Sequence, residues 1–261
     1  MTVYELYKQL CEQIPPTLSC DWDNDGIMCM PEPDRKVERV LLALDITEEV
    51  VDRAIEQHYD IIISHHPLLF RGIKHLTVQD PVARRSIKLC RAGISAISFH
   101  TRLDAVEGGV NDVLATRLML TDATPFGEES IGRVGTLSEP MSAEAFSSMV
   151  ADRLNAPTVT LADSGRPVHR VAVLGGSGGD DVLAALATGA DTYVTGEAPH
   201  HWLVDAPEMG LNLIVAGHYH TENLVMETLA AMVNKLIPDA HILPIHSNAI
   251  KAIINHGHIK N

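Results

Sequence analysis

The chain has 261 residues, of which 46% are hydrophobic, and this is enough for one large α/β domain or two smaller ones. Its formal net charge is -14 and no block of Lys or Arg stands out in the sequence, which disfavours nucleic-acid binding through neutralisation of phosphates. The four cysteines include no C-x-x-C pair, and no apolar run reaches the ~18 residues of a membrane span. We therefore expect a cytoplasmic protein with free thiols and no membrane segment.

The first part of the chain alternates apolar strand patterns with amphipathic helix patterns. Thr2 and Glu5 match a capping box that precedes an apolar stripe, which predicts a helix. Short apolar runs separated by amphipathic segments predict strand–helix–strand units, whose strands are parallel and whose crossovers are right-handed. The expected helices cover 2–14, 47–57, 80–93 and 111–120, and the expected strands cover 40–44, 61–63 and 94–99.

Residues 20–27 form a polar stretch that holds three aspartates and Trp22. Closely spaced aspartates are typical of calcium loops, but the glutamate that closes an EF-hand loop is missing here. We interpret the stretch as a loop of Asx turns anchored by Trp22.

The amino-acid composition changes near Thr121, where prolines and glycines become frequent, and we expect a new structural unit to begin there. Residues 40–66 and 171–197 share the order strand, turn, helix, Asp, strand and polar pair, which indicates a weak internal repeat and two related halves. The later strands are expected at 168–174, 192–195, 211–216 and 241–245, and the later helices at 141–154, 180–188 and from His218 onward.

Histidines and carboxylates gather where the expected strands end. His65 and His66 follow the strand at 61–63, and the carboxyl ends of strands are where open α/β sheets bind ligands. His218 and Glu222 are four residues apart, so one helical turn places them on the same face. Imidazoles and carboxylates without thiolates suit Zn, Mn or Fe(II), and five ligands are about right for two ions if one carboxylate bridges. The candidate metal ligands are His65, His66, Asp104, His218 and Glu222.

The expected site decides the domain organisation. His65 and His218 must reach one place although the break near Thr121 separates them. We therefore expect a discontinuous metal-binding domain, 1–124 plus 213–261, with 125–212 inserted as a second α/β domain. Both domains are expected to have three layers and to be related, with the metal site in the cleft at the strand carboxyl ends.

Other polar residues near these strand ends have different expected roles. Glu197 and His100 follow strands but stand outside the ligand set, so we interpret them as candidate catalytic residues that transfer protons. The glycine run 175–179 lacks the Walker and dinucleotide patterns and predicts a tight turn, with phosphate contact as the alternative. His200 and His201 are candidates for lining the cleft. We interpret the remaining histidines as ordinary: His169, His241, His256 and His258.

At these residues the chain resembles the NIF-three-like proteins, whose members are often labelled type 2 homologues of GTP cyclohydrolase I. The resemblance covers nearly the whole chain in order, except residues 246–261. It implies a dinuclear metal centre, two α/β domains and a toroidal homohexamer, and its ligands fall on the five candidates above. The motifs that carry the resemblance are Trp22-Asp-Asn, Leu44-Asp, Ile63-Ser-His-His-Pro-Leu-Leu-Phe70, His100-Thr-Arg-Leu-Asp104, Gly108-Gly-Val-Asn111, Gly175-Gly-Ser-Gly178, Thr195-Gly-Glu197 and Gly217-His-Tyr-His-Thr-Glu222.

Two classes of function remain open on these observations. The first is a hydrolase that uses two divalent ions and acts on a small phosphorylated or nucleotide-like substrate, with a GTP cyclohydrolase-like reaction among the candidates. The second is a non-enzymatic metal-binding scaffold or regulatory protein. Glu197 lies outside every ligand motif, and an extra acid or base of this kind favours the enzyme.

Overall fold

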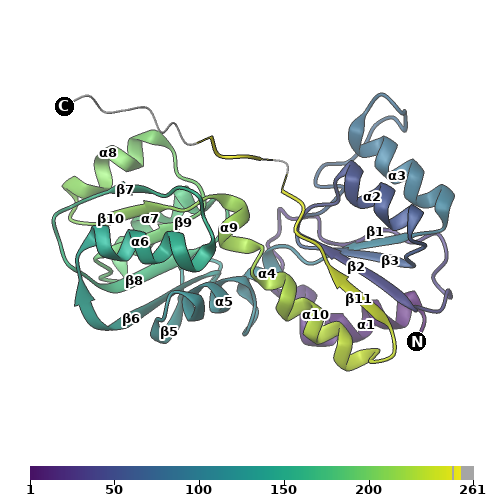
Figure 1. Ribbon diagram of the computed structural model, residues 1–261, viewed down its shortest axis with the longest axis horizontal. Coiled ribbons are helices and arrows are strands. Elements are labelled where there is room, and N and C mark those ends of the chain that lie inside the picture. The colour runs from purple at the N-terminus through teal and green to yellow at the C-terminus, as the bar shows by residue number, and fades with distance from the viewer. Residues whose placement is uncertain (249, 254–261) are drawn as a thin grey trace.

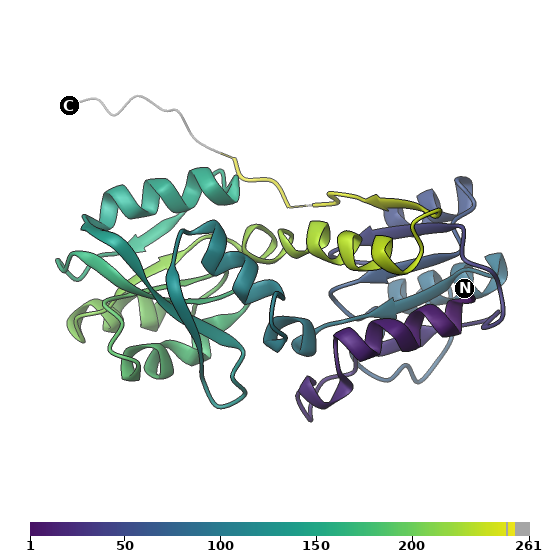
Figure 2. The same ribbon diagram turned by 90° about the horizontal axis from the view of Figure 1, so that it is seen from below.

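The computed structural model describes residues 1–248 and 250–253 and folds them into two α/β bodies, each built on its own sheet (Figure 1). Each sheet has helices against both of its faces, which confirms the predicted three-layer α/β class. The bodies lie side by side, and the view turned by 90° shows the same arrangement (Figure 2). Among the described residues, no helix is both long and apolar enough to cross a bilayer.

The first body surrounds a five-stranded sheet. Side chains alternate between its faces along the central strands, so Val40 and Leu42 pack on one layer of helices and Leu41 and Ala43 on the other. The strands, in sheet order, are β1 (Gly26–Cys29), β4 (Ser95–Ser98), β3 (Ile61–Ser64), β2 (Arg39–Ala43) and β11 (His241–Pro244). One face is covered by α1 (Val3–Gln13) and α10 (Val225–Leu236), and the other by α2 (Glu48–Glu56) and α3 (Pro81–Ala92).

The second body surrounds a six-stranded sheet and is covered in the same way. Its strands, in sheet order, are β5 (Thr121–Phe126), β6 (Gly132–Met141), β8 (Val168–Leu174), β9 (Thr192–Thr195), β10 (Asn212–Val215) and β7 (Thr160–Ala162). One face is covered by α5 (Val110–Arg117) and α6 (Ala143–Leu154), and the other by α7 (Val182–Ala187) and α8 (His200–Glu208). The short helices are η1 (Pro16–Leu18), η2 (Gly178–Asp181), α4 (Thr101–Ala105) and α9 (His218–Glu222), and Figure 1 places α4 and α9 between the bodies.

Strand pairing moves the expected boundaries of the inserted segment. β5 pairs with β6 and β10 pairs with β9, so both belong to the six-stranded sheet. The expected boundaries at 124/125 and 212/213 cut through these two strands and are corrected to positions before Thr121 and after Val215. A short apolar strand such as β10 fits either sheet equally well by its local sequence, and only its neighbours decide. The division into two domains remains our proposal on this pairing.

Two segments that the sequence presented as irregular contain strands. The chain after Thr121 is a hairpin of β5 and β6, and Pro125 is tolerated because β5 is an exposed edge strand. In the polar stretch 20–27, β1 begins at Gly26, and Trp22 is 58% exposed rather than a buried anchor. Asp23 and Asp25 bond to residues of α4 and its N-cap instead of forming isolated Asx turns.

The internal repeat extends to a matching pair of hydrogen-bonded aspartates. β2 pairs in parallel with β3, and β8 pairs in parallel with β9. Asp60 precedes β3 and accepts bonds from the backbone N–H groups of Glu38 and Arg39, at 2.8 and 2.9 Å. Asp191 precedes β9 and accepts equivalent bonds from the backbone at 169–170, at 3.1 and 2.8 Å. The two halves therefore share this aspartate–backbone hydrogen bonding as well as the order of their strands and helices.

Replacing Asp191 with Ala should destabilise the protein by about 1–3 kcal/mol, because two backbone donors at the start of β8 lose their charged acceptor. The matched control is Asp152→Ala, at an exposed site on α6, which should change stability by less than about 0.5 kcal/mol. Urea denaturation measures both. Equal stability of the two variants would contradict a structural role for the repeated aspartate.

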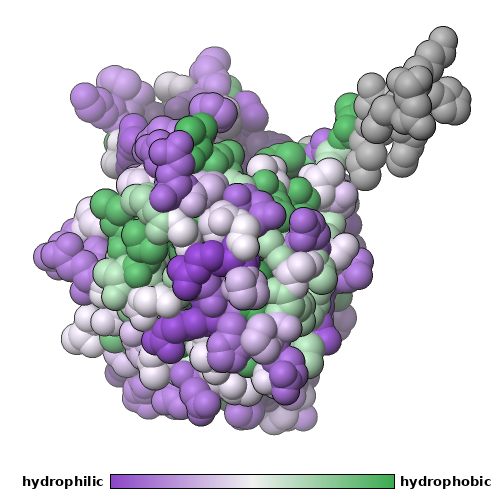
Figure 3. All heavy atoms as spheres, turned by 90° about the vertical axis from the view of Figure 1, so that its left-hand side faces the viewer, coloured by the Kyte–Doolittle hydropathy of each residue, from purple (hydrophilic) through white to green (hydrophobic). Residues whose placement is uncertain are grey.

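The outer face of the second body mixes apolar and polar side chains (Figure 3). Exposed apolar side chains of this body include Leu183 and Val204, which are 54% and 50% exposed. The hexamer implied by the resemblance stays a prediction.

Candidate metal centre

The candidate ligands come from three strand ends that meet between the two bodies. His65 and His66 directly follow β3, and Asp104 lies on α4, which follows β4. His218 and Glu222 are the first and last residues of α9, which follows β10 of the other sheet. The structure thus brings all five sequence-predicted ligands together, and each body contributes part of the cluster.

Glu222 occupies the middle of the cluster. Its Oε2 lies 3.0 Å from both His66 Nε2 and His218 Nε2. Its Oε1 lies 3.7 Å from His65 Nε2, and that nitrogen lies 3.6 Å from Asp104 Oδ1. The two oxygens of one carboxylate therefore face two different sets of donors, which is the geometry a bridging carboxylate requires.

Two of the three imidazoles make a hydrogen bond at the other ring nitrogen, and the third has a carboxylate beside that nitrogen. His65 Nδ1 lies 2.9 Å from the carbonyl oxygen of Phe99, and His66 Nδ1 lies 2.8 Å from Asp45 Oδ1. His218 Nδ1 lies 3.3 Å from Glu197 Oε1. A proton held at Nδ1 by such an acceptor leaves the Nε2 lone pair free toward the cluster, as in histidines that bind metal ions.

Three buried donor atoms of the cluster have ion-pair neighbours but no hydrogen bond among the described residues. His65 Nε2, Asp104 Oδ1 and Glu222 Oε2 are buried without a hydrogen bond among the described residues. His66 Nε2 and His218 Nε2 lie 3.2 Å apart, a distance that suits a hydrogen bond only when one of the two nitrogens carries a proton. A divalent cation among these atoms would satisfy them, so the residues fit a metal site.

The electrostatics of the cluster also favour a cation. Burial raises the pKa of Asp104 to about 6. Burial alone would raise the pKa of Glu222 as well, but the surrounding imidazoles hold it well below its usual range. Burial would lower the pKa of His66, but its hydrogen bond to Asp45 and the Glu222 carboxylate beside it raise this pKa to about 10. The two buried carboxylates therefore favour positive charge beside them, either on the histidines or on a bound cation.

Three overlapping groups in the cluster could each hold a metal ion. The donor atoms within each group lie within 4.8 Å of one another. The groups are His66, His218 and Glu222; His65, Asp104 and Glu222; and His65, His66 and His100. Glu222 is common to the first two groups, and the first two together contain all five predicted ligands.

The glycine run after β8 lets the second body approach the cluster. Gly176 has φ +67°, and a Cβ there would overlap Glu222 Oε1 and lie 3.2 Å from His218 Nε2. The backbone N–H groups of Gly175, Gly176 and Gly178 donate to side chains of the protein itself. These bonds explain the run as a close-packed turn and leave those three donors unavailable to a phosphate.

Comparison with known proteins gives the same assignment over the whole chain. The sequence model of Duf34/NIF3 (NGG1p interacting factor 3) matches residues 1–251. The chain belongs to the Duf34/NIF3 family. The family resemblance drawn from the motifs is thereby confirmed.

Relatives of the Duf34/NIF3 family cover most of the chain. A Clostridium perfringens protein named GTP cyclohydrolase 1 type 2 homolog is 34% identical over 80% of this chain and 82% of its own length. A Schizosaccharomyces pombe protein named NIF3 homolog is 33% identical over 93% of this chain and 92% of its own length. The crystal structure of a Bacillus cereus protein related to NIF3 superposes with a TM-score of 0.88 at 22% identity, covering 97% of this chain and 99% of that one.

A cleft of about 380 Å³ opens beside the candidate ligands of this Duf34/NIF3 chain, lined by residues of both bodies. Asp104, His218 and Glu222 form part of its wall. At its mouth, Trp22, Phe70 and His100 pack edge to face, with ring centroids 6.1–6.3 Å apart. The Trp22 indole N–H donates to Glu129 Oε1 of the second body at 3.2 Å. The cleft gives a small molecule access to the cluster.

The remaining sequence candidates fall into different places. Glu197 is exposed, and its carboxylate meets His218 on the side away from the cluster centre. His100 lines the cleft, and its Nδ1 is held 2.8 Å from Asp23 Oδ1. His200 and His201 are exposed on α8 and do not line this cleft. His169 and His241 belong to none of the three groups, and His256 and His258 lie outside the described residues.

Sequence reasoning missed two residues that orient histidines. Asp45 holds His66, and Asp23 holds His100 and also accepts bonds from the backbone and hydroxyl of Thr101. These bonds, opposing burial, lower the pKa of Asp23 to about 2. Two indications were usable: both aspartates stand in motifs that carry the family resemblance, and Asp45 directly follows the predicted strand at 40–44.

Proposed function

We propose that the protein holds two divalent ions, Zn, Fe or Mn. One ion is assigned to His66, His218 and Glu222, and the other to His65, Asp104 and the second oxygen of Glu222. Nitrogen and oxygen donors without thiolate suit these metals. The support is the set of buried donor atoms that converge and make no hydrogen bond among the described residues.

We propose further that the protein is a metal-dependent hydrolase acting on a small phosphorylated or nucleotide-like molecule. A pair of bound ions would supply a nucleophile at neutral pH and stabilise developing negative charge. The observation that carries this proposal is the cleft of about 380 Å³ that reaches the ligands from both bodies, because a metal store requires no such opening. The names of relatives such as the C. perfringens homologue point to the same reaction class.

Two residues beside the cluster take separate roles in this proposal. His100 lines the cleft, and Asp23 fixes its Nδ1, so its Nε2 is available to exchange a proton with a leaving group. Glu197 is the ion-pair partner of His218 at Nδ1 and takes the role of a positioning residue, although the sequence had assigned it proton transfer. Both roles are predictions.

The test is a panel of reactions on metal-loaded protein purified without a histidine tag. The panel contains phosphate esters, nucleotides including GTP, and cyclic amidines. We expect metal-dependent turnover of at least one of them. No turnover across the panel by protein with full metal content would overturn the hydrolase and leave the metal-binding scaffold or regulatory protein as the better interpretation.

Replacing Glu197 with Gln should keep both ions bound and lower turnover at least about tenfold, because His218 loses its charged orienting partner. The readout specific to a positioning role is metal affinity, which should also fall about tenfold in a chelator competition, in the range typical for such orienting partners. His201→Ala, an exposed histidine on α8, is the control. Lower turnover with unchanged metal affinity would instead support Glu197 as a proton donor.

A further inference from the structure

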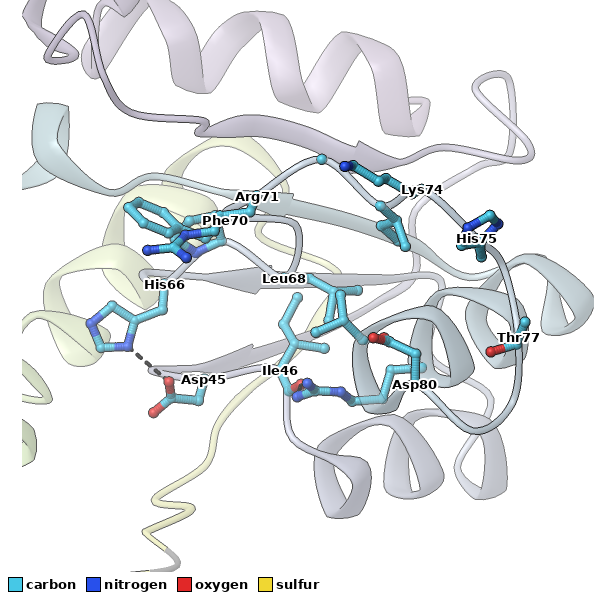
Figure 4. Close-up of a pocket in the computed structure, with 15 residues that line it drawn as sticks. Asp45, Ile46, His66, Leu68, Phe70, Arg71, Lys74, His75, Thr77 and Asp80 are labelled. Carbon is cyan, nitrogen blue, oxygen red and sulfur yellow. Dashed lines mark hydrogen bonds and ion pairs between the residues drawn. The ribbon is translucent and has the colours of Figure 1, made fainter.

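A second pocket lies on the other side of His66, under the loop that joins β3 to α3. Its volume is about 720 Å³, and Asp45 and His66 form the end that adjoins the metal centre. Figure 4 shows Phe70 and Arg71 near the His66 end, with Lys74 and His75 farther along the loop. The pocket therefore runs from the candidate ligands out along the loop.

The loop is basic in a protein that is otherwise acidic. Residues 71–79 contain Arg71, Lys74 and His75 and no Asp or Glu, whereas the whole chain has a net charge of -14. All three side chains line the pocket. Local cations in a concave site attract an anion even when the net charge of the protein opposes it.

These cations are not used by the fold. Among the described residues, Arg71, Lys74 and His75 are exposed and none of them makes an ion pair or a side-chain hydrogen bond. Arg85 also lines the pocket but differs, since it donates to the backbone carbonyl oxygens of Ile46 and Pro81. Surface cations that stabilise a fold usually have acidic partners, as Lys88 does here. The loop cations thus remain available to a ligand.

The acidic residues of the pocket are already engaged. Asp45 accepts a bond from His66 Nδ1, and Asp80 caps α3 by accepting from the backbone N–H of Ala83. Both lie on the wall opposite the loop in Figure 4. They leave the loop side of the pocket positive.

We propose that Arg71 and Lys74 bind the phosphate group of a phosphorylated small-molecule substrate and place its reactive end against the metal centre at His66. This inference rests on the proposed hydrolase function and specifies its substrate class. The Arg guanidinium suits bidentate contact with phosphate oxygens, and Lys adds a point charge. A pocket of about 720 Å³ exceeds what inorganic phosphate needs, and Ile46, Leu68 and Val82 give it an apolar wall for an organic moiety.

The small number of cations on the loop favours a small molecule over nucleic acid as the ligand of this pocket. Two permanent charges on one short loop neutralise too few phosphates for a stable grip on a polynucleotide at physiological salt. The aromatic cluster at the neighbouring cleft, which shares Phe70 with this pocket, does not change that count.

The experiment compares inorganic tripolyphosphate binding, by calorimetry, among three metal-loaded proteins. They are the wild type, the variant with Arg71→Gln and Lys74→Gln, and a control with Arg153→Gln and Lys235→Gln. The control removes the same charge from exposed residues outside the pocket. We expect the dissociation constant to rise at least about tenfold in the loop variant, since each charge-assisted bond contributes on that scale, and to change less than about twofold in the control. Metal content should be equal in all three.

Other outcomes separate the sources of binding. Equal affinity in the wild type and the loop variant, or an equal loss in the control, would overturn the proposal. Tripolyphosphate binding that disappears in Glu222→Ala would assign it to the metal centre alone, which would also overturn it. A single-stranded oligonucleotide that binds more tightly than tripolyphosphate and requires Arg71 and Lys74 would replace the small molecule with a polynucleotide. If the reaction panel gives no turnover but the loop variant still binds tripolyphosphate more weakly than the wild type, the proposed hydrolase function is overturned and the phosphate-binding role of the loop stands.

Discussion

Glu222→Ala is expected to remove both metal ions from the protein while the fold remains. One oxygen of Glu222 faces His66 and His218 and the other faces His65, so its loss opens both groups at once. His218 belongs only to the first group and Asp104 only to the second. His218→Ala and Asp104→Ala should therefore each keep one ion. Elemental analysis after dialysis against a chelator-treated buffer gives the ion-to-protein ratio for each variant.

The control for this series is Glu208→Ala, an exposed glutamate at the end of α8. It should match the wild type in metal content, and circular dichroism should show similar helix content in every variant. An equal ratio in Glu222→Ala and the wild type would refute the assignment of Glu222 as a shared ligand. Loss of both ions in His218→Ala would mean that the two groups are not separable.

Gly176→Ala should empty the metal centre without touching a ligand. The added Cβ would overlap Glu222 Oε1 and lie 3.0 Å from the carboxyl carbon, so Glu222 must move out of the cluster. The backbone at Gly176 has φ +67°, which adds about 1–2 kcal/mol of strain for a residue with a side chain. We expect metal content to fall below half of the wild-type value, measured by the same elemental analysis.

Gly165→Ala separates the two effects of this substitution. Gly165 has φ +76°, but a Cβ there meets no atom within 4 Å. It should therefore lose about the same stability from backbone strain and keep full metal content. If both alanine variants lose metal equally, backbone strain rather than contact with Glu222 would be the cause.

The candidate ligands could be predicted from the sequence because each one follows a strand, either directly or on the short helix that comes next. Parallel strands bring their carboxyl ends to one edge, so position along the chain already implied proximity for His65 and Asp104. The four-residue spacing of His218 and Glu222 implied one helix face, and α9 confirms it. These inferences needed only local periodicity and the rule for parallel sheets.

Other features depended on contacts that local sequence does not encode. β10 is an apolar run that fits either sheet, and its pairing with β9 decides its place. In the sequence, Pro125 and the glycines near it indicate an interruption of secondary structure. In the structure they lie in and beside a hairpin at the edge of the sheet, where the outer side of the strand has no neighbouring strand to bond. Asp45 and Asp23 orient histidines that lie 21 and 77 residues away, which a motif of adjacent residues cannot show.

The most direct test of the account is anomalous X-ray diffraction at the metal absorption edges, on crystals of tag-free protein. We expect two peaks, one contacted by His66 and His218 and the other by His65 and Asp104, with Glu222 touching both. A single peak that all five residues share, or two ions with neither bound by Glu222, would contradict it.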